Sequence, residues 1–313
     1  MFTDLSFMQR LSGCRVLVTG AGGFIGPRVV RALLDHGATV RALVGPPHQP
    51  FQVLKSESLE NVVADICDVP VVKRLVDGVD VVVHMAGPAS VAASFADPVG
   101  FASVHVLGTT SLLTACANAS VRRFVYISSA EVYGRPQTAL VQENHPIAPR
   151  SPYGAAKAAA EEFVRVFALN SFIPSVILRP FSVYGPGASP KSLCGTILKM
   201  ARREDAVVLQ DLSPVRDYCF IDDVADAIVR ACTLPVEGSA SINIGSGVGV
   251  SVVDFASAVV RALGRNIPVR QSGDTRRPAS AEIYHLIADR TRAETLLGWK
   301  PTTTLKSGIR ACL

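Results

Sequence analysis

The feature that most constrains the fold is a glycine-rich turn close to the start of the chain. Glycine stands at Gly20, Gly23 and Gly26, directly after the compact apolar run 14–19, and a helical pattern of apolar residues follows. A strand, a glycine turn and a helix in this order direct backbone N–H groups and a helix N-terminus toward one point, which suits a diphosphate. The spacing is GxxGxxG, and the competing interpretation is an ordinary glycine-rich loop. Its position after a first strand favours a dinucleotide site.

Strand-like and helix-like segments alternate over the first 180 residues. The expected strands are 14–19, 38–44, 59–64, 79–85, 123–128 and 174–179, and the expected helices include 71–76, 101–117 and 152–170. Apolar strands separated by helices are typical of a parallel sheet covered on both faces. Right-handed crossovers then give an α/β fold with a doubly wound, Rossmann-type sheet.

After Pro180 the pattern changes, because Gly and Pro interrupt the chain and the helices become shorter. We expect a Rossmann domain over residues 1–180 and a smaller mixed α/β C-terminal lobe over 181–313. A short strand near 240–245 is expected to return to the main sheet. Trp299 is expected to pack in the small lobe.

Composition limits the function classes. Of 313 residues, 49% are hydrophobic and 18% are charged, which suits a globular core. The net charge of +5 is scattered along the chain, so nucleic-acid binding is not indicated. We expect no membrane-spanning segment, because charge, Gly or Pro interrupts each apolar run, and no secretory signal. Seven Cys without a CxxC pair predict free thiols in a reducing, cytoplasmic environment, and no metal site is expected.

Tyr153 and Lys157 form the second informative motif. They are spaced i, i+4 within a predicted helix, so they share one face. A phenol normally titrates near ~10, and we expect a neighbouring Lys cation and a nicotinamide cation to lower that value. Tyr153 then takes the proton from a substrate hydroxyl while hydride leaves the same carbon. Ser129, at the end of a predicted strand, is placed to donate a hydrogen bond to the same oxygen.

Taken together, these motifs make the chain similar to an extended short-chain dehydrogenase/reductase of the NAD-dependent epimerase/dehydratase family, whose members act mostly on nucleotide sugars. The matching stretches run almost end to end. They include TGAGGFIG at 19–26, VVHMAG at 82–87, ISSAEVYG at 127–134, SPYGAAK at 151–157, RPFSVYGPG at 179–187, RDYCFIDDVADA at 216–227, NIGSG at 243–247 and LLGWKP at 296–301.

The resemblance implies roles for individual residues. The implied cofactor-binding residues are Gly20, Gly23, Phe24, Ile25, Gly26, Asp65, Ile66, Met85, Ala86, Gly87, Tyr153, Lys157 and Pro180. The implied catalytic residues are Ser129, Glu131, Tyr153 and Lys157, and the implied substrate-binding residues are Ser90, Ser182, Arg216, Arg276 and Arg277. Arg216 matches an arginine that grips the substrate diphosphate, and the competing interpretation is an ion pair with Asp217 or Asp222. The resemblance also implies a homodimer that pairs helices 101–117 and 152–170 into a four-helix bundle.

The choice between NAD and NADP depends on the end of the second strand. NAD enzymes of this type place an acidic residue there for the ribose 2′-hydroxyl, but Val44 occupies the position. Arg41 and His48 are nearby candidates for a 2′-phosphate, and surface charge is the alternative for both. The expected cofactor is NAD, with NADP left open.

The chain departs from the family pattern at several positions. The family's dehydratases carry Thr-Asp-Glu where this chain has Ser129-Ala130-Glu131, so the Asp is missing. Catalysis and a helix-cap or ion-pair role are equally open for Glu131. His105 stands where the family usually has Asn, and Ser182 replaces another usual Asn.

These observations predict an NAD-dependent nucleotide-sugar epimerase that works through a transient 4-keto sugar. The alternatives are a nucleotide-sugar dehydratase or decarboxylase and an NADPH-dependent ketosugar reductase. A non-enzymatic, cofactor-sensing regulator is a third reading, and the intact Tyr153–Lys157 pair counts against it.

Overall fold

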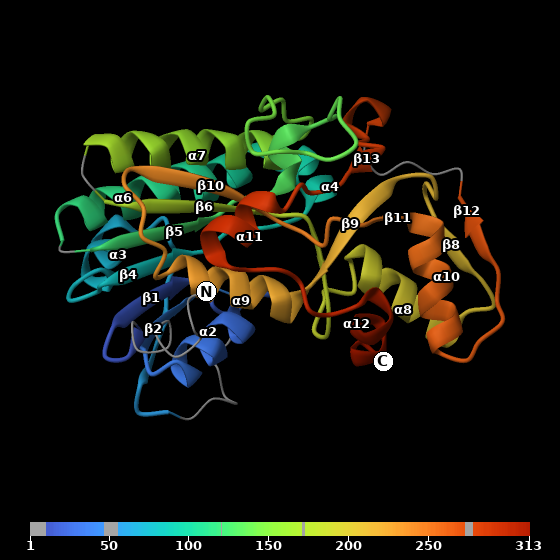
Figure 1. Cartoon of the computed structure of the whole chain (residues 1–313), viewed down its shortest axis with the longest axis horizontal. Helices are drawn as coiled ribbons and strands as arrows, with labels where there is room; N and C mark the ends of the chain where they lie inside the picture. The colour runs from blue at the N-terminus through green and yellow to red at the C-terminus, as the bar shows by residue number, and fades with distance from the viewer. Residues whose placement is uncertain (1–10, 47–55, 120, 171–172, 273–277) are drawn as a thin grey trace.

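The computed structural model describes residues 11–46, 56–119, 121–170, 173–272 and 278–313, and its centre is a seven-stranded parallel sheet (Figure 1). The strand order is β10-β6-β5-β4-β1-β2-β3. The strands are β1 (Arg15–Thr19), β2 (Thr39–Val44), β3 (Leu59–Val63), β4 (Val81–His84), β5 (Arg123–Ile127), β6 (Ser175–Pro180) and β10 (Ser239–Ile244). The predicted doubly wound sheet is therefore confirmed. The order reverses between β1 and β4, and ligands of such sheets bind outside the carboxyl ends of the strands at this point.

Helices cover both faces of the sheet, because successive strand residues point to opposite sides. Val16 and Val18 of β1 face one apolar core, and Leu17 faces the other. The first core is covered by α2 (Gly26–Asp35), α9 (Ile221–Ala231) and α11 (Thr291–Leu297), and the second by α3 (Val69–Leu75), α6 (Thr109–Ala117) and α7 (Pro152–Asn170). In Figure 1, α7 lies above the sheet and α2 and α9 lie below it.

A long apolar helix runs from Pro98 to Ala117. It consists of α5 (Pro98–Ala102), the π-helical turn η1 (Ser103–Gly108) and α6, and it follows the short helix α4 (Val91–Ala96). By length and composition alone this helix is long and apolar enough to cross a membrane, which the interruptions by Gly100 and Gly108 did not lead us to expect. In the structure it packs against α3 and α7.

The smaller lobe, at the right of Figure 1, has its own apolar core. Its strands are β7 (Ser182–Tyr184), β9 (Val215–Phe220), β11 (Gly249–Ser251) and β13 (His285–Leu286), with the separate pair β8 (Val207–Leu209) and β12 (Val269–Gln271). Its helices are α8 (Leu193–Arg203), α10 (Val252–Ala262) and α12 (Leu305–Ala311), and the short 3-10 turns of the chain are η2 (Ala130–Tyr133) and η3 (Ala279–Ala281). Most of these strands have only two or three residues, which leaves too short a pattern for sequence periodicity to detect.

The chain after Pro180 also contributes to the main core. Strand β10 pairs with β6, and α9 and α11 cover one face of the large sheet. Trp299 is 1% exposed within this same core, and its indole N–H donates to the Asp223 carbonyl at 2.9 Å. The expectation that Trp299 packs in the small lobe is therefore wrong, because the segment after α11 crosses back over α9.

Candidate functional site

The glycine turn packs directly on neighbouring backbone. Gly20 has a φ of 71°, and a Cβ there would lie 2.8 Å from the Ala86 amide nitrogen. At Gly26 a Cβ would lie 2.1 Å from the Ala21 carbonyl oxygen, because the start of α2 touches the end of β1. A side chain at Gly20 would push the turn away from the segment after β4, and one at Gly26 would push the turn and the helix apart. The turn therefore requires glycine for its shape, which is also the shape that admits a diphosphate.

The N-terminus of α2 has the chemistry of an anion site. Within the described part of the chain no side chain caps this helix, and its first turn holds no acidic residue. The helix dipole at this end therefore favours a negatively charged group, although Pro27 has no N–H and the Arg28 amide already donates to the Ile25 carbonyl at 3.1 Å. Phe24 and Ile25 occupy the turn itself, with Ile25 at the N-cap position. The turn fits the pyrophosphate of a dinucleotide.

The segment after β4 lies beside the glycine turn. The Thr19 hydroxyl oxygen accepts hydrogen bonds from the Met85 and Ala86 amides at 3.3 and 3.2 Å. His84 is fully buried between two hydroxyl groups, with Nδ1 2.6 Å from Thr19 Oγ1 and Nε2 2.8 Å from Thr109 Oγ1. Burial and the Lys157 charge lower the pKa of His84 well below its usual value, so the ring is neutral. These contacts fix the backbone at the switch point of the sheet.

The segment after β3 brings Asp65 and Ile66 toward the same edge. The Asp65 carboxylate accepts a hydrogen bond from the Cys67 amide at 2.9 Å, and Ile66 is buried against Gly108. These local contacts are compatible with the cofactor-binding role that the resemblance implies for both residues, which stays a prediction.

The Arg41 side chain is already occupied. Its guanidinium donates to the Glu60 carboxylate at 2.7 Å and to the carbonyl oxygens of Leu75 and Asp77 at 2.7 and 3.0 Å. These partners support the alternative, in which Arg41 is a structural group of the surface, and a role in binding a 2′-phosphate stays a prediction that the structure does not favour. The other candidate, His48, lies outside the described residues.

Tyr153 and Lys157 lie in the first turns of α7, and both are buried, at 7% and 4% exposure. Tyr153 packs edge-on against Phe101 and His105. The Lys157 ammonium donates to the Ile127 carbonyl at the end of β5, at 2.6 Å, and lies 4.8 Å from the Tyr126 ring centroid. The structure thus brings the pair together with the end of β5.

The pKa of the Tyr153 phenol differs from the expected direction. Burial raises it to about 12, hydrogen bonding with Ser129 lowers it, and the negative charge of Glu131 raises it further. Lys157 has its own pKa lowered to about 7 by the same burial, with Glu161 acting in the opposite direction. In the protein alone, burial therefore outweighs the Ser129 hydrogen bond, and the lowered phenol pKa, which was expected beside a nicotinamide cation, stays a prediction for the site with its cofactor bound.

Glu131 lies on η2, the 3-10 turn after β5, and Ser129 directly precedes this turn. The Ser129 hydroxyl oxygen caps this turn by accepting the Glu131 amide at 3.2 Å. Ala130 between them is 2% exposed, so the position that holds Asp in dehydratases carries only a buried methyl group. The turn therefore presents one hydroxyl and one carboxylate toward the start of α7.

Arg216 lies on β9 and is nearly buried. Its guanidinium donates to the Glu282 carboxylate at 2.9 Å, with both side chains 10% exposed. The expected partners were wrong, because the Asp217 carboxylate accepts the Ser246 and Gly247 amides and Asp222 pairs with Arg28. The guanidinium also donates to the Val215 carbonyl at 3.2 Å, so among the described residues Glu282 and this carbonyl orient the group and take two of its five N–H groups.

The remaining candidates, four for the substrate and Pro180 for the cofactor, differ in their surroundings. Ser90 is exposed and its hydroxyl oxygen caps α4 by accepting the Ala93 amide at 3.2 Å. Ser182 is half-buried on β7, and Pro180 is buried at the end of β6. Arg276 and Arg277 lie outside the described residues.

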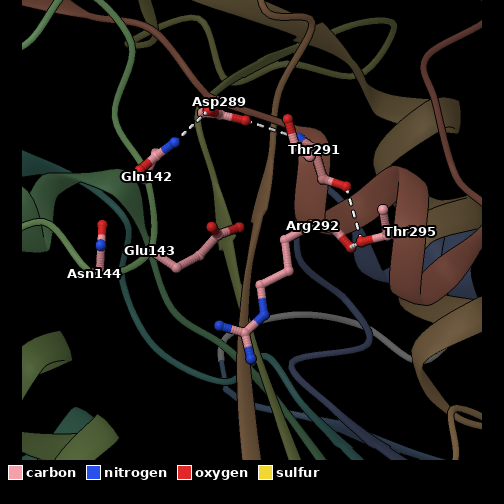
Figure 2. A pocket seen from close by; sticks show the side chains of 7 residues that line it. All are labelled: Gln142, Glu143, Asn144, Asp289, Thr291, Arg292 and Thr295. Atoms are coloured by element: carbon pink, nitrogen blue, oxygen red, sulfur yellow. Dashed lines mark hydrogen bonds between the residues drawn. The ribbon is translucent and has the colours of Figure 1, made fainter.

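A pocket at the edge of the sheet is separate from these residues. It has a volume of about 320 Å³ and lies between the segment 142–144 and α11. Figure 2 shows its lining, in which Gln142 donates to Asp289 at 3.0 Å and Asp289 accepts the Thr291 amide at 2.9 Å. No sequence-predicted site residue lines it. In the described ranges, no group of three or more His, Cys, Asp or Glu side chains is arranged to hold a metal ion.

Sequence reasoning missed two buried features beside the site. His105 was noted only as a departure, although it contacts Tyr153. The Glu161–Arg179 ion pair, one turn beyond Lys157 on α7, was not anticipated. The available signal was Glu161 itself, because a charged residue on the buried face of an Ala-rich helix needs a charged partner.

Comparisons with known proteins agree with this geometry. The model of the NAD dependent epimerase/dehydratase family matches residues 16–245. A UDP-glucose 4-epimerase of Mycolicibacterium smegmatis is 34% identical over 305 residues, covering 94% of this chain and 96% of the relative. A dTDP-D-glucose 4,6-dehydratase of Mus musculus is 29% identical, covering 95% and 86%. The solved structure of MoeE5 in complex with UDP-glucuronic acid and NAD aligns with a TM-score of 0.86 at 30% identity, covering 95% and 97%.

Proposed function

The chain belongs to the NAD-dependent epimerase/dehydratase family, and from that premise we propose that it is an NAD-dependent nucleotide-sugar epimerase working through a transient 4-keto sugar. The observation that carries this proposal is the meeting of the buried Tyr153 and Lys157 with the half-buried Ser129 at the end of β5. NAD, when bound, accepts a hydride from the sugar and returns it. The turn at Gly20 and the start of α2 would hold its pyrophosphate.

Tyr153 is the proposed acid and base. Its phenolate oxygen takes the proton of the sugar 4-hydroxyl, and the phenol so formed later returns a proton to the same sugar oxygen. Ser129 stabilises the phenolate by hydrogen bonding, because its bond to Tyr153 lowers the pKa of the phenol. Lys157 is held at the end of β5 by the Ile127 carbonyl, and any positive charge on it favours the phenolate. The site thus moves a proton without exposing it to bulk water.

Arg216 is the proposed anchor of the substrate diphosphate. A guanidinium fork binds a phosphate through paired N–H groups, and Glu282 already fixes its orientation. A fixed anchor suits an epimerase, because the oxidised sugar must turn while the nucleotide stays bound.

The proposal is tested by turnover of a panel of UDP- and dTDP-sugars, including UDP-glucose and UDP-glucuronic acid, with products resolved by NMR. An epimerase converts a substrate to its 4-epimer without net consumption of NAD. Loss of water from the sugar would instead indicate a dehydratase, and stoichiometric NADPH oxidation would indicate a reductase. The buried Ala130 argues against the dehydratase, because the proton-donating Asp of that class is missing.

A homodimer is proposed from an apolar surface on two neighbouring helices. The exposed apolar residues on the Pro98–Ala117 helix and on α7 are Val99, Leu107, Phe163, Val166 and Leu169. Their pairing with the same face of a second copy would bury them in a four-helix bundle. Light scattering after gel filtration measures the mass, and Leu169→Glu is expected to yield monomers. A wild-type monomer at micromolar concentration contradicts the dimer.

We also propose a cytoplasmic location. None of the seven cysteines, all of which lie in the described residues, forms a disulfide, and four of them are buried. Unpaired thiols are usual in reducing compartments. Fractionation of cells that produce the protein checks this placement.

A further inference from the structure

His105 occupies an unusual position in the helix that packs against α7. It lies in the π-helical turn η1, between the regular turns of α5 and α6, and its side chain is 1% exposed. π-turns are rare, and they concentrate at functional sites because they redirect a side chain. Here the redirected imidazole lies under the segment that follows β4.

Two contacts fasten this segment to the ring. His105 Nε2 lies 2.9 Å from the Pro88 carbonyl oxygen, and a carbonyl can only accept, so Nε2 carries the proton. Gly87 has a φ of 134°, and a Cβ there would lie 2.2 Å from His105 Cε1. The imidazole therefore lies directly on the Gly87 backbone, and only glycine permits that approach.

The same ring touches the proposed base. The His105 and Tyr153 ring centroids are 5.6 Å apart at an interplanar angle of 65°, an edge-to-face contact. Phe101 packs against both rings, at 5.9 Å from His105 and 6.2 Å from Tyr153. One imidazole thus joins the segment after β4 to the phenol on α7.

The ring is neutral in its surroundings. Burial and the nearby Lys157 charge lower the pKa of His105 to about 3, although the bond to Pro88 acts in the opposite direction. Within the described residues Nδ1 is buried without a hydrogen-bond partner, as expected of a bare acceptor nitrogen. The tautomer with the proton on Nε2 is therefore fixed across the range in which the enzyme works.

We propose that His105 is a positioning residue, which holds the Tyr153 hydroxyl at a fixed place relative to the Gly87–Pro88 backbone. The proposal rests on the proposed function, because it takes Tyr153 as the acid and base. Asn, which the family usually has here, offers an amide donor but no aromatic edge. In this chain the ring therefore supplies both the hydrogen bond and the packing surface.

Two variants separate the two contributions. His105→Phe keeps the ring and removes the donor, and His105→Gln keeps a donor and removes the ring. We expect His105→Phe to lower kcat about 10- to 100-fold, because small misplacements of a catalytic group have effects of this size. KM is expected to stay within about threefold, since substrate binding is not removed. His105→Gln is expected to recover part of the loss in kcat.

His145→Phe is the matched control. The His145 ring also packs edge-on against a tyrosine, Tyr133 at 5.9 Å, and its Nδ1 lies 3.0 Å from the Pro146 carbonyl oxygen. It contacts none of the proposed catalytic residues, so its kcat is expected to equal that of wild type. A purely structural role for His105 predicts lower Tm with unchanged kcat in His105→Phe. That result, or an equal loss in His105→Phe and the control, overturns the proposal.

A second readout does not need turnover. In ¹⁵N-histidine NMR, the His105 signals are assigned by their loss in His105→Phe. We expect a protonated Nε2 and a bare Nδ1, unchanged between about pH 5 and 9. A titration of this ring in that range overturns the proposed contact with Pro88. A protein that turns over no sugar but retains this signature would refute the proposed function and leave the ring's placement standing.

Discussion

One helix carries two buried charged groups whose surroundings differ. Lys157 and Glu161 lie one turn apart on α7, at 4% and 0% exposure. Glu161 receives two hydrogen bonds from the Arg179 guanidinium, at 2.9 and 2.6 Å, and a third from Arg165 at 2.6 Å. Lys157 is held by a carbonyl oxygen at the end of β5. Burial is the same, but the partners are not.

The pKa values follow the partners. The guanidinium groups of Arg179 and Arg165 hold the pKa of Glu161 below its usual value in spite of burial, so this carboxylate stays charged. Burial lowers the pKa of Lys157 to about 7, and only the Glu161 charge acts in the opposite direction. A fully paired charge fixes structure, whereas a partly compensated one can change its protonation near neutral pH. Glu161 with its arginine partners therefore forms the structural half of α7, and Tyr153 with Lys157 forms the reactive half.

The largest effect is expected in the reactive half. Tyr153→Phe removes the hydroxyl that transfers the proton and keeps the buried ring, so kcat is expected to fall about 10²- to 10⁴-fold. Circular dichroism and Tm check that the fold is retained. Turnover within tenfold of wild type would show that another group transfers the proton.

The structural half is tested by Arg179→Met. This variant leaves the Glu161 carboxylate buried with one guanidinium fewer, and the free energy of unfolding is expected to fall by about 3–5 kcal/mol. Urea denaturation measures it. The control is Arg165→Met, because Arg165 binds the same carboxylate from a position that is 28% exposed, and a loss of about 1 kcal/mol or less is expected. Equal losses would contradict the distinction between the two arginines.

Lys157→Met tests the lowered pKa of Lys157 through the pH dependence of the free energy of unfolding. The folded-state pKa of Lys157, about 7, lies below its ordinary value of 10.5. Between these values the unfolded chain binds a proton that the folded chain has released, so wild-type stability is expected to rise with pH relative to Lys157→Met. The slope is at most about 1.4 kcal/mol per pH unit. Urea curves from pH 7 to 9.5 measure it, and parallel pH dependences would refute the lowered pKa.

The smallest effect concerns Glu131. Its charge raises the pKa of Tyr153, so Glu131→Gln is expected to move the limb of the kcat–pH profile that reports Tyr153 ionisation to lower pH. Turnover on that limb rises about two- to threefold if Glu131 acts only through its charge. A fall of tenfold or more would instead identify a proton-transfer role. Glu162→Gln, an exposed carboxylate on α7, is the control and is expected to leave the profile unchanged.

The sequence by itself determined the parallel sheet, the glycine turn and the helix that carries Tyr153 and Lys157. These features can be predicted because each follows from a pattern of residues near one another in the chain, although the strands that pair in the sheet lie far apart. The turn needs Gly20 and Gly26 because neighbouring backbone leaves no room for a Cβ, and spacings of two and four residues fix which side chains share a face.

Only the tertiary structure decided which charged side chains form ion pairs and which side chains can change their protonation near neutral pH. Arg216 forms an ion pair with Glu282, which lies sixty-six residues later in the chain, and the π-turn brings the His105 ring against Tyr153. The Tyr153 phenol becomes a weaker acid because it is buried, which no spacing along the chain reveals. Ionisation depends on the dielectric surroundings and charged neighbours in space, and those are set only when the ends of distant strands come together.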